Sequence, residues 1–172
     1  MYSMFRRQKA RSFPNCARVS GGDVGQNRDR LIAFIEDQRI ELVFSERIAP
    51  ALGMSYGGRI AILPGQSKAE EFSTLVHELA HEMLHKAERR TATTKTVRET
   101  EAEAIAFVIG KAVGLETGTK SADYIQLYHG NASLLAESLE VIQHTSALIL
   151  AALQPSIEEA MTATTELSEV AA

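Results

Sequence analysis

The sequence predicts an α+β fold in which a small twisted sheet packs against several helices. Two observations lead to this prediction: the strand-like stretches are short and lie between residues 41 and 63, and segments with helical spacing fill most of the remaining chain. With 172 residues, of which 45% are hydrophobic and 23% charged, the chain suits one globular domain with a hydrophobic core. We therefore expect one domain over residues 19–154, between a disordered basic leader at 1–18 and a disordered acidic tail at 155–172.

The first predicted elements are a short helix and three short strands. The spacing of four apolar residues between positions 31 and 35 predicts a helix over residues 27–38, and residues 41–44 then read as a strand. The next stretch, 54–63, carries the pair Gly57-Gly58 between two strand-like halves. Because glycine tolerates positive φ, this pair predicts a tight hairpin, and Pro64-Gly65 ends its second strand.

The remaining elements are predicted to be helices. Ser67, followed three residues later by Glu70, forms a capping box that begins a helix over residues 68–85. Its buried stripe consists of Phe72, Val76, Leu79 and Met83. A Thr-rich loop over 91–96 leads to a helix over 97–113, which the C-cap residue Gly114 ends. A short helix at 122–128 and a long one at 132–153 complete the fold.

Composition predicts a soluble protein of a reducing compartment, which we take to be the cytoplasm. The chain has a single cysteine, Cys16, and residues 1–7 contain no apolar signal segment. The longest apolar run, residues 147–153, is too short to cross a bilayer. Residues 1–30 carry seven Lys or Arg against two Asp, so a basic segment precedes an acidic body. A solvated leader is the favoured interpretation, and contact with nucleic acid is the alternative.

The chemistry is expected on the helix over 68–85, which contains the pattern H-E-x-x-H. His77 and His81 are one turn apart and therefore present their imidazoles to the same point in space. A catalytic zinc site needs three protein ligands and one open position. Glu78 lies beside the metal rather than on it, which suits a general base that activates a zinc-bound water. Two solvent-facing histidines are the alternative, but both histidines border the apolar stripe, whereas Glu82 marks the solvent side of the helix.

A third ligand is expected from the helix over 97–113. Glu101 shares a helical stripe with Ala104 and Val108, and a carboxylate on an apolar stripe is costly to bury unless a partner such as zinc compensates it. Glu103 remains the alternative ligand. Glu99 and Glu103 lie on a different face of the helix, where they are expected to be solvated or to contact a metal ligand rather than the metal itself.

Other polar residues are weaker candidates. His85 is one further turn along the helix, where a capping or surface role is favoured over a ligand role. His129 and His144 read as loop and surface residues. Tyr56 and Tyr124 are candidates for substrate binding as neutral hydrogen-bond donors, although packed core tyrosines are more common. The strand over 56–63 is a candidate edge strand for binding an extended peptide.

The pair of motifs, H-E-L-A-H followed by E-x-E-A-x-x-F, resembles the ImmA/IrrE-type metallopeptidases. The closer resemblance is to the C-terminal zincin-like domain of ArdC-type antirestriction proteins, and it extends over residues 17–153. The stretches that carry it are residues 49–58, 63–65, 70–82, 98–104 and 121–128. The resemblance implies a zincin-like fold with Zn²⁺ held by His77, His81 and Glu101, in a gluzincin-like arrangement, and Glu78 as catalytic base.

Two functions follow from the resemblance. The first is a zinc-dependent endopeptidase that acts on a protein, for instance a repressor or another regulator. The second is a non-proteolytic zinc-containing binding module in antirestriction or DNA-linked regulation. ArdC-type proteins carry a single-stranded-DNA-binding domain before the zincin-like domain, and here only the short leader precedes it. Glu78 favours the enzyme, because a structural site has no use for a base beside an open coordination position.

Overall fold

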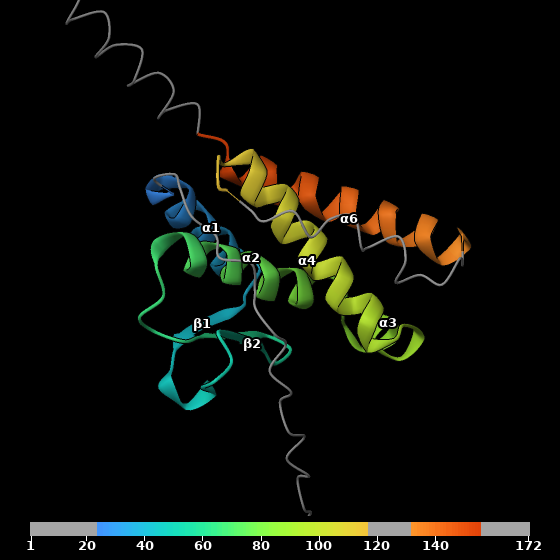
Figure 1. Ribbon diagram of the computed structural model, residues 1–172, viewed down its shortest axis with the longest axis horizontal. Coiled ribbons are helices and arrows are strands. Elements are labelled where there is room, and N and C mark those ends of the chain that lie inside the picture. Colours follow the sequence, from blue (N-terminus) through green and yellow to red (C-terminus); the bar gives the residue numbers. More distant parts are fainter. Residues whose placement is uncertain (1–23, 117–131, 156–172) are drawn as a thin grey trace, which may run out of the picture.

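The computed structural model describes residues 24–116 and 132–155 and confirms the predicted α+β class (Figure 1). The predicted leader, the predicted helix at 122–128 and residues 156–172 of the predicted tail lie outside these residues. The elements, in chain order, are α1 (Gly25–Asp37), β1 (Glu41–Phe44), the 3₁₀ helix η1 (Glu46–Ile48), β2 (Gly53–Ser55), β3 (Arg59–Ile62), α2 (Lys68–Leu84), α3 (Ala87–Ala92), α4 (Lys95–Ala112) and α6 (Ala132–Leu153).

The sheet has three strands in the order β1-β3-β2. β1 runs parallel to β3, with Glu41 opposite Arg59, whereas β2 and β3 form the predicted antiparallel hairpin. Gly57 and Gly58 make its turn with φ values of 75° and 101°, as the glycine pair predicts. The prediction of an edge strand over 56–63 is wrong: β3 is the central strand, and β2 lies at the edge of the sheet.

One face of the sheet is covered by α1 and α2 (Figure 1). Ile60 and Ile62 of β3 are fully buried on this side and belong to the same core as Phe72, Leu75 and Leu79 of α2. α4 packs along α2, and α6 packs along α4 and α1. The helix α2 is therefore enclosed between the sheet and α4, which places its polar residues next to both.

The predicted Thr-rich loop over 91–96 differs from the structure. Helix α3 occupies Ala87–Ala92, and α4 begins at Lys95 rather than at residue 97. The threonines serve as caps: the Thr94 hydroxyl accepts a hydrogen bond from the Val97 N–H at 3.2 Å. Residues that resemble a loop in composition therefore end one helix and begin the next.

The helix α6 is, by length and composition alone, apolar enough to cross a membrane, with a mean hydropathy of 1.2 over its best window. Its buried side contains three hydroxyl side chains, those of Ser138, Thr145 and Ser146, besides Ile149 and Leu153. This side faces α4 and α1, so α6 is part of the core of the described unit.

Candidate metal centre

The predicted helix with the H-E-x-x-H pattern is present as α2. Both hydrogen bonds of the predicted capping box are formed between Ser67 and Glu70 at its first turn. On this helix His77 and His81 are one turn apart, and their Nε2 atoms are 3.2 Å from one another. The two imidazoles thus converge as the spacing predicts, and their side chains are 22% and 14% exposed.

The third donor at this point is Glu99 of α4. Its Oε2 atom is 3.7 Å from the Nε2 atoms of both His77 and His81. An ion with tetrahedral bonds of about 2.0–2.1 Å separates its ligand atoms by roughly 3.4 Å. The three separations of 3.2, 3.7 and 3.7 Å agree with this value to within a few tenths of an ångström. His77, His81 and Glu99 therefore fit a zinc ion, and their donor atoms form a group in the described part of the chain.

The structure does not bring Glu101, the predicted third ligand, to this group. Glu101 is fully buried, as its apolar stripe predicts, but its partners are protein side chains. Its carboxylate accepts hydrogen bonds from Arg89 and Ser138, each at 2.6 Å, and contacts His85 Nε2 at 3.0 Å. The inference from burial to zinc fails because a guanidinium, a hydroxyl and an imidazole compensate this carboxylate instead.

The positions of the glutamates around the axis of α4 explain why Glu99, and not Glu101, meets the histidines. Glu99 and Glu103 are one turn apart and lie on the face toward His77, whose Nδ1 atom is 3.4 Å from Glu103 Oε2. Glu101, two residues from each, points roughly 200° away around the helix. A solvated or outer role was the prediction for both carboxylates; in the structure Glu99 lies beside the two histidines, and Glu103 contacts His77. The signal in the sequence was the matching i, i+4 spacing of two His on α2 and two Glu on α4.

The predicted catalytic base, Glu78, is buried between α2 and β2. Burial raises the pKa of its carboxyl to about 7, although the charge of His77 and a hydrogen bond with Ser55 act in the opposite direction. Gly53 lies directly against Glu78, since a Cβ atom at this position would be 2.7 Å from Glu78 Cγ. A glycine in β2 therefore provides the space in which the Glu78 side chain lies.

The two histidines of the group differ in their protonation, because only His77 is held in its charged form by the carboxylates. Burial lowers the pKa of His77, but its hydrogen bonds with Glu103 and Glu99 outweigh this effect and raise the pKa to about 10. Burial raises the pKa of Glu99, but both histidines outweigh it and hold the pKa well below its usual range. Burial lowers the pKa of His81. The site thus combines an ionised carboxylate with two histidines, the residue types that zinc prefers, and His77 would have to release a proton to bind the ion.

Glu82 was predicted on the solvent side of α2, and this prediction is wrong because the residue is buried. Its two carboxylate oxygens accept hydrogen bonds from the backbone N–H groups of Gly57 and Gly58, at 2.7 and 2.6 Å. This side chain holds the hairpin turn against α2, and it thereby fixes β2 beside Glu78.

His85, predicted to be a capping or surface residue, is the C-cap residue of α2 but is buried. Its Nδ1 atom is 2.7 Å from Nδ1 of His81. His85 therefore contacts His81 through the ring nitrogen opposite to the Nε2 atom that meets His77 and Glu99. His144 is exposed on α6, as predicted, and His129 lies outside the described residues.

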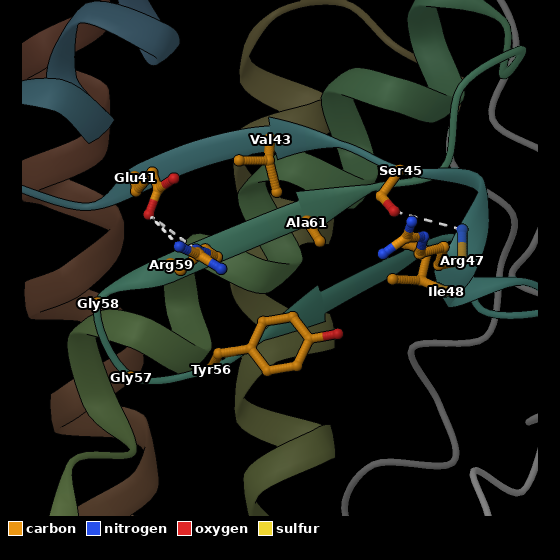
Figure 2. Close-up of a pocket in the computed structure, with 10 residues that line it drawn as sticks. All are labelled: Glu41, Val43, Ser45, Arg47, Ile48, Tyr56, Gly57, Gly58, Arg59 and Ala61. Atoms are coloured by element: carbon orange, nitrogen blue, oxygen red, sulfur yellow. Dashed lines mark hydrogen bonds and ion pairs between the residues drawn. The ribbon is translucent and has the colours of Figure 1, made fainter.

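The predicted substrate-binding residue Tyr56 lies on the other face of the sheet (Figure 2). Its hydroxyl donates to Met54 Sδ at 2.9 Å. Gly53 and Ser55 of β2 face Glu78, and because successive residues of a strand point to opposite faces, Met54 points away from Glu78. Tyr56 lines a shallow pocket with Val43, Ala61 and the ion pair of Arg59 and Glu41. This pocket is separated from the histidines by the sheet. The other candidate, Tyr124, is outside the described residues.

Comparisons of the chain with family models, with characterised proteins and with solved structures found no match. The resemblance to the ImmA/IrrE and ArdC-type domains therefore stays a prediction, and the function has to be argued from the geometry of this centre.

Proposed function

We propose that the protein is a zinc-dependent metallopeptidase whose metal ligands are His77, His81 and Glu99 and whose general base is Glu78. The observation that carries the proposal is the agreement of the three donor separations with tetrahedral zinc. A zincin-like assignment of the fold belongs to the same proposal, supported by a helix that bears the motif beneath a small mixed sheet.

The number of donors favours a catalytic site over a structural one. Structural zinc sites are closed by four protein ligands, whereas catalytic sites have three and keep one position open. Among the described residues the group consists of three, and Glu103 is directed to the Nδ1 atom of His77. This argues against the alternative of a binding module with a structural zinc ion.

When bound, zinc supplies a Lewis acid that polarises the scissile carbonyl and acidifies water. Glu78 takes a proton from the water molecule whose oxygen attacks the carbonyl carbon, and passes this proton to the amide nitrogen as the C–N bond breaks. The buried position of Glu78, with a pKa of about 7, suits a group that must both accept and return a proton near neutral pH.

The edge strand supports a peptide as substrate. β2 is paired with β3 on one side, and it lies at the edge of the sheet next to Glu78, which touches Gly53 and Ser55. An extended peptide that paired with the outer edge of β2 would have its backbone carbonyls beside this carboxylate. A protein substrate that presents an extended segment fits this arrangement.

The test compares zinc-loaded wild type with Glu78→Gln on a library of peptides derived from a bacterial proteome, with new N-termini identified by mass spectrometry. We expect wild type to cleave at defined sites and Glu78→Gln to be slower by about 10²–10⁴-fold, the usual contribution of a general base. Zinc content, measured in both proteins, should be equal. Cleavage that persists in Glu78→Gln, or that wild type lacks despite bound zinc, would contradict the peptidase proposal.

A further inference from the structure

A buried chain of polar side chains leads away from the candidate metal centre to three other helices. It starts at His81, whose Nδ1 atom is 2.7 Å from His85 Nδ1, and continues from His85 Nε2 to Glu101 Oε2 over 3.0 Å. His85 and Glu101 have side-chain exposures of 1% and 0%. Neither residue contacts the metal position, and neither has a role in the mechanism above.

The direction of the hydrogen bonds follows from the ligand role of His81. If Nε2 of His81 presents its lone pair to the metal, the hydrogen of this ring is on Nδ1. The Nδ1–H group then donates to Nδ1 of His85, so the hydrogen of His85 is on Nε2, from which it donates to Glu101. Each donor thus meets an acceptor, and the chain ends on a carboxylate.

Two elements, α3 and α6, hold this carboxylate in its acceptor role. Arg89 of α3 donates from Nη2 to Glu101 Oε1 at 2.6 Å, and the Ser138 hydroxyl of α6 donates to the same oxygen at 2.6 Å. Oε2 is thereby left to His85. Since a carboxylate that faces a guanidinium and a hydroxyl only accepts hydrogen bonds, the chain has a single direction, from His81 to Glu101.

We propose that His85 and Glu101 are positioning residues, which hold His81 in the tautomer and ring orientation that direct its Nε2 atom to the metal. Ligand histidines generally donate their second N–H to a carboxylate or carbonyl, and the loss of that partner weakens metal affinity. In this protein an additional imidazole extends the connection, because Glu101 lies one side chain too far from His81. The inference rests on the proposed metal site, but it does not depend on peptidase activity.

The test measures Zn²⁺ affinity by chelator competition, together with the visible absorption spectrum of the Co²⁺-loaded protein. His85→Phe keeps the volume of the ring and removes both nitrogens, and we expect affinity to fall by about 10–100-fold with a changed Co²⁺ spectrum. His85→Gln keeps one acceptor and one donor, and it should restore the affinity to within about threefold and the spectrum to that of wild type.

Glu137→Gln is the matched control. Glu137 binds the other terminal nitrogen of Arg89, at 2.6 Å, but lies outside the chain from His81 to Glu101. Its substitution should leave affinity within about twofold of wild type. Circular dichroism verifies folding, and His85→Leu replaces His85→Phe if the latter does not fold.

Several outcomes overturn the inference. Unchanged affinity and spectrum in folded His85→Phe would do so, and so would equal weakening in His85→Gln, which would mean that packing rather than hydrogen bonding matters. Wild type that binds no metal would overturn both this inference and the metal site. Wild type that binds zinc normally but cleaves no peptide would contradict only the peptidase proposal.

Discussion

At the scale of single residues, the roles of the acidic side chains on α4 depend on their position around the helix. Glu99 is directed to the two histidines, whereas Glu101 is directed to His85 and Arg89. The two carboxylates are only two residues apart, but the first has zinc-ligand geometry and the second has charge and hydrogen-bond partners of its own. They form a matched pair for mutagenesis.

We expect Glu99→Gln to weaken Zn²⁺ binding by about 100-fold or more, because it removes the anionic donor of the site. Glu101→Gln keeps an oxygen that accepts from His85 and should lose no more than about tenfold. Chelator competition on both variants measures the difference. A larger loss in Glu101→Gln than in Glu99→Gln would reverse the assignment of the third ligand.

A second residue-scale prediction concerns Gly53. A Cβ atom there would lie 2.6 Å from Thr74 Cγ2 and 2.7 Å from Glu78 Cγ, so Gly53→Ala overpacks the contact between β2 and α2. We expect the free energy of unfolding to fall by about 1–3 kcal/mol, as measured by urea denaturation.

Thr74→Ser supplies the control for Gly53→Ala. It removes the methyl group but keeps the hydroxyl that donates to the Glu70 carbonyl and to Gln66. Combined with Gly53→Ala, it should recover part of the lost stability, because the two residues are in contact. Strict additivity of the two changes would mean that the predicted clash does not occur.

At the scale of elements, the site depends on a hairpin that is held against a helix. Glu82 of α2 accepts two backbone hydrogen bonds from the turn between β2 and β3. Arg59 of the same hairpin forms an exposed ion pair with Glu41 of β1, with separations of 2.7 Å. Two carboxylates thus bind neighbouring parts of one hairpin, one buried and one exposed.

We expect Glu82→Ala to lower the free energy of unfolding by about 2 kcal/mol, because it removes two charge-assisted hydrogen bonds at a buried position. Glu41→Ala should cost less than about 1 kcal/mol, since exposed ion pairs contribute little. Urea denaturation of both variants provides the comparison. Equal losses would show that the hydrogen bonds of Glu82 contribute no more than a surface pair.

At the scale of the whole molecule, the proposed ligands join two helices that the chain connects through α3. His77 and His81 belong to α2 and Glu99 to α4, and these helices already share a core that contains Leu79, Ala102 and Ile105. A metal ion at this point would add a link between them near the ends of their contact. Ion binding and folding should therefore be coupled.

We expect saturating Zn²⁺ to raise the melting temperature of wild type and EDTA to reverse the shift. A ligand at about 1,000 times its Kd stabilises the native state by roughly 4 kcal/mol. Differential scanning fluorimetry measures the shift, which should be small in Glu99→Gln. Mg²⁺, which prefers oxygen ligands, serves as the control ion and should leave wild type unchanged. An equal shift with both ions would contradict a site built from imidazoles.

Much of the fold was predictable because its signals are local. The helix period, the Ser67–Glu70 capping box and the Gly57-Gly58 pair each act through residues a few positions apart, and the structure contains the corresponding elements. Helix α3 was not predicted, since its end and the start of α4 share a run of threonines. The parallel pairing of β1 with β3 was also not predicted, because it joins segments separated by η1 and β2.

The sequence by itself determined that His77 and His81 converge with Glu78 beside them, because an i, i+4 spacing on a helix leaves little choice of geometry. It also determined that Glu101 is buried, because its neighbours on the stripe are apolar. Only the tertiary structure decided which carboxylate meets the histidines. That choice depends on the rotation of α4 about its axis relative to α2, which packing of Ala102, Ile105 and Ile109 in the core fixes. The same packing directs Glu99 toward the histidines and places Glu101 in contact with His85, Arg89 and Ser138.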